Sequence, residues 1–210
     1  MIYSNNFITD GFRYKCARCA SCCRDWDGII YVSIYEVKNI ADNLNLTLEE
    51  VFKDFIHMEE QTVDYGGESI ELTYLAINQV DNHCVFLDEN DNCIIHEYKP
   101  FLCKIYPFWS IIMEKSDNFE EYSQKCKGFN NQDGPLYNKE DIEEILKSEE
   151  DYLENLNRVA LIMNSIDETE ILAIMMERMD LNSRIDEDAL ELLRNNLVIK
   201  KIQILINQNS

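Results

Sequence analysis

Eight cysteines constrain this chain more than any other feature of its sequence. Four of them lie within eight positions, in the stretch KCARCASCCRDWDG (15–28), and the other four are single and widely spaced. They are Cys16, Cys19, Cys22, Cys23, Cys84, Cys93, Cys103 and Cys126. A disulfide scaffold is usually a much shorter exported chain, and the N-terminus here lacks the basic and apolar regions of a signal peptide. The cysteines therefore predict a metal or redox site in a cytoplasmic protein.

The first three thiols have the spacing C-x-x-C-x-x-C, which places three ligands on one short loop. Bacterial-type ferredoxins use the same run and complete the ligand set with a distant cysteine. Zinc also accepts four thiolates, but structural zinc sites often use two C-x-x-C pairs, and no second pair is present here. The spacing favours a 4Fe–4S cluster, with zinc as the alternative. We expect Cys16, Cys19 and either Cys22 or Cys23 to bind it, together with a distal cysteine, preferably Cys103.

Cys22 and Cys23 are adjacent, and neighbouring side chains on an extended backbone point to opposite sides. The two thiols need not bind the same metal. All eight cysteines are candidate ligands, and the sequence leaves open whether they form one centre or two.

The composition changes sharply near Asn138. Residues 1–137 contain every cysteine, proline, histidine and tryptophan, and residues 138–210 contain none of these and no glycine. This shift predicts a cysteine-cluster metal-binding domain over 1–137 and a helical extension over 138–210. Short strand-like runs and helical segments in the first part indicate an α+β fold.

Local signals place the elements of the first part. Residues 27–33 form a short β-like run, and the S-x-x-E and T-x-x-E spacings at Ser33 and Thr47 predict capped helices. Gly66-Gly67 predicts a hairpin turn between two strands. A second, tighter hairpin is expected to turn at DENDN, between Cys84 and Cys93.

The second part shows helical periodicity. Apolar residues recur at helical spacing over 139–163, and two further helices are expected at 168–180 and 187–206. These segments predict a three-helix unit that packs on the cysteine domain. The same helices are candidates for docking a protein partner.

The net charge is −21, with −12 over residues 1–137 and −9 over 138–210. An acidic surface of this kind repels phosphate backbones and anionic lipid, so we expect neither nucleic-acid nor membrane binding. No apolar run approaches the ~18 residues of a membrane span.

Three segments together resemble a known family: CARCASCC, then CVFLDENDNCIIHEYKPFLCKIYPF, then KCKGF. They are similar to the cysteine-cluster family written C-x-x-C-x-x-C-C, a zinc- or iron-chelating domain also called the YkgJ-type family. The likeness covers about residues 13–130. Lys99 stands where the family usually has arginine, and His96 where it usually has tyrosine. The resemblance implies metal or cluster binding, and one branch of the family resembles flagellin lysine N-methylases.

The expected function is that of an iron–sulfur protein in electron transfer, or in maturation of a partner metalloenzyme. A zinc-stabilised interaction module and a lysine-methylase-like enzyme are the alternatives. No acid, base or nucleophile constellation stands out, and no glycine-rich phosphate loop is present, so the sequence leaves catalysis open. Among the histidines, only His96 is expected to act at the site, as a group that donates to a metal ligand.

Overall fold

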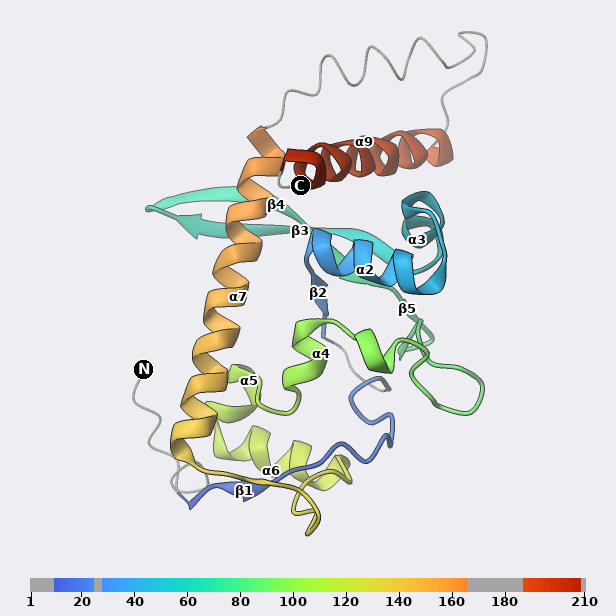
Figure 1. Cartoon of the computed structure of the whole chain (residues 1–210). Helices are drawn as coiled ribbons and strands as arrows, with labels where there is room; N and C mark the ends of the chain where they lie inside the picture. The colour runs from blue at the N-terminus through green and yellow to red at the C-terminus, as the bar shows by residue number, and fades with distance from the viewer. Residues whose placement is uncertain (1–9, 25–27, 166–186, 209–210) are drawn as a thin grey trace, which may run out of the picture. The chain divides into compact units, whose positions relative to one another are not determined.

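The computed structural model describes residues 10–24, 28–165 and 187–208, and the fold is α+β (Figure 1). The chain forms two compact units. Unit 1 comprises 1–30 and 77–155, and unit 2 comprises 31–76 and 156–210. The sequence predicts a domain boundary between residues 137 and 138. This boundary stays a prediction, because the division into compact units does not show which segments fold independently.

Unit 2 is built on a three-stranded sheet with the order β2-β4-β3. The strands are β2 (Tyr31–Val32), β3 (Ile56–Tyr65) and β4 (Glu68–Ile77). Tyr31 pairs antiparallel with Ala76. Gly66 and Gly67 connect β3 to β4 with φ angles of 67° and 89°, which glycine adopts without a steric cost. The hairpin predicted at this pair is therefore confirmed.

Two capped helices complete the N-terminal part of unit 2, as predicted. They are α2 (Ile34–Leu44) and α3 (Leu48–Asp54), and both have a full capping box, formed by Ser33 with Glu36 and by Thr47 with Glu50. Val37, Ile40 and Val51 are fully buried in the core of the unit.

The C-terminal helix α9 (Glu187–Gln208) also belongs to unit 2 and contacts α3. It confirms the helix expected over 187–206. Ile199 and Ile202 are buried, so this helix contributes to the core of its own unit. The helix expected at 168–180 lies outside the described residues, and the three-helix unit stays a prediction.

Unit 1 contains short elements that position loops rather than a large sheet. They are β1 (Phe12–Arg13), β5 (Gln79–Val80), β6 (His83–Cys84), the 3-10 helix η1 (His96–Tyr98), α4 (Phe101–Ile105), α5 (Ser110–Met113), α6 (Ser116–Lys125) and β7 (Leu136–Tyr137). β1 pairs antiparallel with β7, and β5 with β6. An aromatic core packs β1, α5, α6 and β7 together, and in it the Phe12 ring lies 5.3 Å from the rings of both Phe108 and Phe129.

The turn at DENDN is smaller than the hairpin that the sequence predicts. It is closed by a single bridge between Leu87 and Cys93, while β6 pairs with β5 instead. The Asp88 carboxylate accepts hydrogen bonds from the amides of Asn90 and Asn92, at 2.9 and 2.8 Å. Backbone bonds from the Asp88 amide to the Asn92 carbonyl and from the Ile94 amide to the Phe86 carbonyl, both 2.9 Å, close the turn around this bridge.

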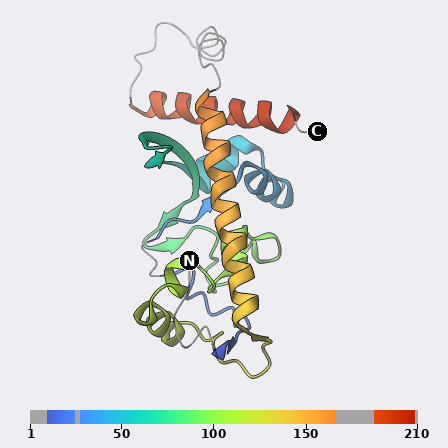
Figure 2. The ribbon, with the colours of Figure 1, turned by 90° about the vertical axis from the view of Figure 1, so that its left-hand side faces the viewer.

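Helix α7 (Lys139–Ser165) is continuous in both views and contributes to both units (Figures 1 and 2). Its first part buries Ile142 and Leu146 in the aromatic core of unit 1. In its second part, Asn157 accepts a hydrogen bond of 2.7 Å from the Tyr74 hydroxyl in unit 2. Among the described helices, none combines the length and the hydropathy that a membrane crossing requires.

Candidate metal centre

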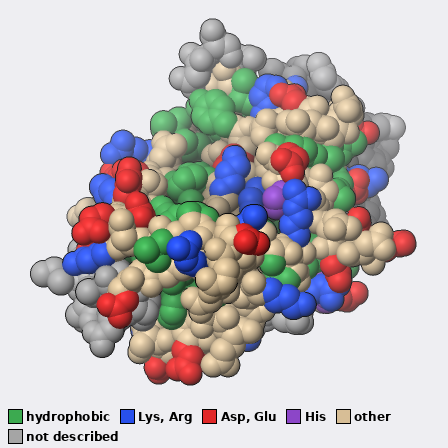
Figure 3. Space-filling model, turned by 60° about the horizontal axis from the view of Figure 1, so that its bottom comes forward, with side chains coloured by type: hydrophobic (Ala, Val, Ile, Leu, Met, Phe, Trp, Pro, Cys, Tyr) green, Lys and Arg blue, Asp and Glu red, His purple; other side chains and the backbone are tan. Residues whose placement is uncertain are grey.

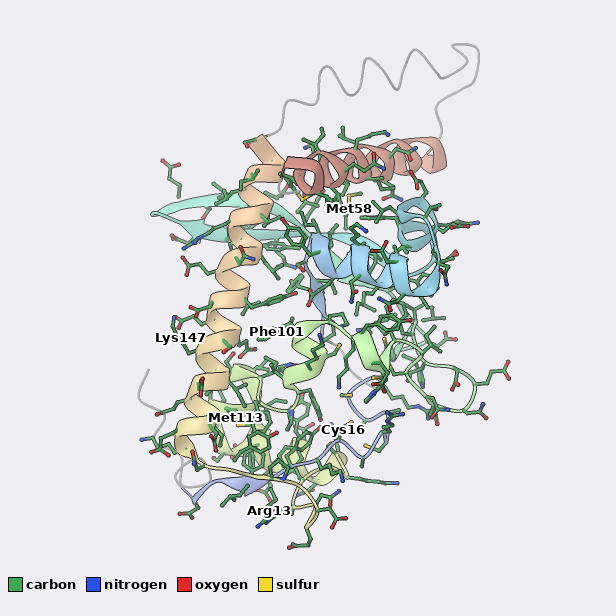
Figure 4. The ribbon with its side chains drawn as sticks, in the orientation of Figure 1. Arg13, Cys16, Met58, Phe101, Met113 and Lys147 are labelled. Carbon is green, nitrogen blue, oxygen red and sulfur yellow. The ribbon has the colours of Figure 1, made fainter. Side chains whose placement is uncertain are left out.

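All eight cysteines line a single cavity in unit 1, of about 70 Å³. Cys16 is exposed, Cys126 is buried, and the other six are half-buried. The lining also includes Tyr14, Tyr106, His96 and Lys99. Figure 4 labels Cys16 on the loop after β1, where further sulfur atoms are visible. Tertiary structure thus gathers thiols that are up to 110 positions apart in the chain (126 − 16).

The N-terminal cysteine loop curls because two of its residues adopt a left-handed backbone. Arg18 and Ala20 have φ angles of 50° and 58°, which residues other than glycine rarely adopt. The Cys23 amide then donates a 2.8 Å hydrogen bond to the Ala20 carbonyl. This turn lets four thiols within eight positions face one cavity.

One edge of the cavity joins the N-terminal loop to the segment around Cys126. The Lys15 amide donates to the Gly128 carbonyl at 3.1 Å, and Tyr14 forms a bridge with Phe129. The Cys19 Sγ lies 3.1 Å from the Ser21 Oγ. Burial raises the pKa of Cys19, but hydrogen bonding from Ser21 outweighs it, and the net pKa is lowered. Burial raises the pKa of Cys126.

Another edge joins the end of the loop to β6. The Cys84 amide donates to the Cys23 carbonyl at 2.8 Å, and the Sγ atoms of Cys22 and Cys23 are 3.5 Å apart. The bond from Cys23 lowers the pKa of Cys22 to about 7, with help from Lys99. The Cys23 thiol also lowers the pKa of Cys84, and its own pKa is strongly raised by both bonds.

Cys93 and Cys103 lie on the same side as Cys84. The Ile94 amide donates to the Phe86 carbonyl at 2.9 Å, which aligns the Cys93 segment beside the residues after Cys84. Cys103 projects from α4. Burial raises the pKa of both thiols, and the charges of Cys84 and Cys22 raise it further.

Backbone amides two residues along the chain lower the pKa of several of these thiols, although burial still leaves the pKa of Cys93 and Cys126 raised. The amide of Phe86 donates a hydrogen bond to Cys84, that of Ile95 to Cys93 and that of Gly128 to Cys126. The amide of Ser21 donates to Cys19 in the same way. A donor directed at sulfur favours the charged form, and bonds of this kind tune metal–thiolate centres.

Sequence reasoning missed two tyrosines and one serine at the site. Tyr14 and Tyr106 line the cavity, and burial and the nearby Cys126 raise the pKa of both hydroxyls. Both therefore remain protonated donors beside the thiolates. Tyr14 lies two positions before Cys16 and Tyr106 three positions after Cys103, but tyrosines are common core residues and gave no distinct signal.

His96 lies where the sequence places it, at the cavity. Its Nδ1 is 3.4 Å from the Glu97 carboxylate, and its buried Nε2 has no hydrogen-bond partner among the residues that the structure describes. His83 and His57 do not line the cavity. Whether His96 donates to a ligand stays a prediction.

Two ion pairs tie the cysteine loop to the segment between Cys84 and Pro100. Arg24 pairs with Asp91, and Arg18 with Glu97 at 3.0 Å. The second pair is largely exposed, so it contributes less than about 1 kcal/mol.

The aromatic residues near Cys103 in the sequence make two separate contacts. Phe108 and Trp109 belong to the aromatic core, which contains Cys126 and contacts Cys19 and Cys22. Phe101 stacks on Tyr152 of α7, with the ring centroids 4.7 Å apart. The aromatic shell therefore lies mainly on the Cys126 side of the cavity.

Within 10–24, 28–165 and 187–208, no three His, Cys, Asp or Glu side chains stand as the ligands of one ion. The thiols therefore converge on a cavity without enclosing a single point.

One family model matches the chain, over residues 15–127, which is more than half its length. Its description reads "CxxCxxCC: Putative zinc- or iron-chelating domain". The matched segment spans all eight cysteines. No solved structure matches the chain.

Proposed function

Because the chain belongs to the CxxCxxCC family of zinc- or iron-chelating domains, we propose that it is a cytoplasmic iron–sulfur protein. Its role would be electron transfer, or the activation of a partner metalloenzyme. The observation that carries the proposal is the convergence of eight thiols on one cavity. When bound, a 4Fe–4S cluster supplies one-electron chemistry.

The residues present fit a thiolate-ligated group. Backbone amides and the Ser21 hydroxyl favour thiolates, and the hydrogen bond from Cys23 lowers the pKa of Cys22 to about 7. The buried Nε2 of His96 has no hydrogen-bond partner among the described residues, and His96 lines the cavity, so this atom is placed to interact with a group held there. Tyr14 and Tyr106 offer further hydroxyl donors. We propose all eight cysteines as ligands.

Basic side chains flank the thiols, although the protein is acidic. The segments 11–24, 99–104 and 125–128 contain eight of the 19 Lys and Arg residues and no Asp or Glu. Lys15, Lys104 and Lys127 are exposed. On the face seen in Figure 3, Lys and Arg side chains gather beside a histidine. Such a surface favours the approach of an anionic redox partner.

The partner is proposed to be a protein. Docking through the C-terminal helices stays a prediction, and the buried positions of α9 already pack within unit 2. The basic segments around the cavity are therefore the better candidate for an acidic protein surface.

Anaerobic purification and metal analysis test this function. We expect iron and acid-labile sulfide in equal amounts, with broad visible absorption that bleaches on reduction. Stoichiometric zinc without sulfide would overturn the cluster and favour the zinc-stabilised module. Binding of a methyl donor, measured by calorimetry, would favour a methylase-like enzyme.

A further inference from the structure

Two different kinds of contact hold the eight thiols in their common cavity, and we name a group of four thiols after each. The Cys126 group, on the side of the aromatic core, comprises Cys16, Cys19, Cys22 and Cys126. The Cys84 group, beside β6 and α4, comprises Cys23, Cys84, Cys93 and Cys103.

Packing defines the Cys126 group. Cys126 is a member of the aromatic core, and Cys19 and Cys22 pack against that core. The bond from the Lys15 amide to the Gly128 carbonyl holds the start of the loop, which includes Cys16, beside this segment. The charges of Cys126, Cys16 and Cys22 raise the pKa of the Tyr14 hydroxyl, so Tyr14 lies near three of the four thiols.

Backbone pairing defines the Cys84 group. Cys23 and Cys84 are joined by the 2.8 Å amide–carbonyl bond, and Arg24 and His83 form a bridge one residue further along. The bridge between Leu87 and Cys93 then brings Cys93 alongside. Cys103 on α4 lines the same cavity, and the charges of Cys84, Cys22 and Cys93 raise its pKa, so two of its three charged neighbours belong to this group.

We propose that the cavity holds two metal centres, one bound by the Cys126 group and one by the Cys84 group. Four thiolates complete the ligand set of either a zinc ion or an iron–sulfur cluster. In this arrangement Cys22 and Cys23 are the covalent link between the centres, because these adjacent residues belong to different groups. This inference rests on the proposed metal-binding function and extends it to two sites.

A single centre would give a different arrangement. In a zinc–thiolate tetrahedron with Zn–S bonds of about 2.3 Å, two sulfur atoms are roughly 3.8 Å apart. The 3.5 Å distance between the Cys22 and Cys23 sulfur atoms would also suit two ligands of one metal ion. The other six thiols must therefore distinguish one centre from two.

Metal content of matched variants, after anaerobic reconstitution with iron and sulfide, separates one centre from two. Cys16→Ala and Cys93→Ala should each hold half the iron of the wild type. The double variant C16A/C19A, within one group, should still hold half, whereas C16A/C93A, across the groups, should hold none. Circular dichroism of the helices checks that each variant folds.

Three results would overturn the two-centre inference: loss of all iron in Cys16→Ala, loss of all iron in C16A/C19A, or retention of half in C16A/C93A. A wild-type protein that binds neither iron nor zinc would instead overturn the proposed function. The two failures are therefore distinguishable.

A measurement on the wild type avoids any effect of mutation. Partial removal of metal by a chelator, followed by alkylation and mass spectrometry, should expose thiols in sets of four. Molecules with one labelled group and one protected group support two centres. Labelling of all eight thiols together would contradict them.

Discussion

The Sγ atoms of Cys22 and Cys23 lie 3.5 Å apart, and their pKa values move in opposite directions. Their hydrogen bond lowers the pKa of Cys22 to about 7 and raises that of Cys23, the pattern of a Cys23 thiol that keeps its proton beside a Cys22 thiolate. Adjacent cysteines in the sequence are thus chemically distinct in the fold.

Alkylation of the metal-free, reduced protein tests this pair. Because the thiolate is the reactive form, Cys22 should react with iodoacetamide at a rate that rises as the pH passes 7, while Cys23 stays unreactive. Cys23→Ala removes the donor and should slow labelling of Cys22 at pH 7 by roughly tenfold. Cys16, which is exposed, serves as the internal reference. Equal rates at Cys22 in the wild type and in Cys23→Ala would refute the assignment.

Gly128 controls the contact between the Cys126 segment and the N-terminal loop. A Cβ atom there would lie 2.6 Å from a Tyr14 ring carbon and 2.8 Å from the Lys15 carbonyl. Gly128→Ala should therefore push the two segments apart and lower stability by about 1–3 kcal/mol.

Metal analysis of Gly128→Ala should show loss from the Cys126 group and retention in the Cys84 group. Lys127→Ala, an exposed neighbour, is the control and should keep its full metal content. Full retention in Gly128→Ala would show that this close approach does not position the ligands.

The basic segments beside the thiols should govern reaction with anionic oxidants. Replacement of Lys15, Lys104 and Lys127 by Glu should slow oxidation of the reduced protein by ferricyanide about tenfold at low salt, because electrostatic steering is lost. Stopped-flow rates at increasing ionic strength give the measurement, and the wild-type rate should fall with salt.

The matched control replaces Lys38, Lys53 and Lys200 of unit 2 by Glu, which changes the net charge equally. Its rate should fall less. Equal slowing in both triple variants would mean that total charge, rather than its placement near the thiols, determines the rate.

Glu149 on α7 is buried, and its carboxylate accepts a 2.7 Å hydrogen bond from the Ser110 amide at the start of α5. Glu149→Ala leaves that amide without an acceptor and should cost about 1–3 kcal/mol of unfolding free energy. Glu149→Gln keeps an acceptor and should cost less. The exposed Glu150→Ala is the control, expected within about 0.5 kcal/mol of the wild type.

The pH dependence at Glu149 follows from its raised pKa, which burial causes. A carboxyl group with a raised pKa contributes stability below its ordinary value of 4.5, and this is lost as the pH rises through the folded value. Urea unfolding should therefore show Glu149→Gln gaining stability relative to the wild type as the pH rises from 4 to 7. A constant difference would contradict a raised pKa.

Local chemistry made parts of the fold predictable. Ser33 and Thr47 start helices because each side chain satisfies an amide that the helix leaves open, and this needs only residues three positions apart. Gly66 and Gly67 form the hairpin turn because glycine adopts the positive φ angles that the turn requires, which is also a local property. The position of the DENDN turn was predictable but the extent of its strands was not, because the pairing there is limited to the bridge between Leu87 and Cys93.

The cysteine spacing by itself determined the class of site: eight thiols, with a three-ligand loop, specify metal chemistry through the preference of soft metals for sulfur. Only the tertiary structure decided which thiols are neighbours. The pairing of Cys23 with Cys84, and the packing of Cys19 and Cys22 with Cys126, depend on contacts between segments about 60 to 110 positions apart. Such contacts are set by burial and backbone pairing across the whole unit, and no spacing within a motif encodes them.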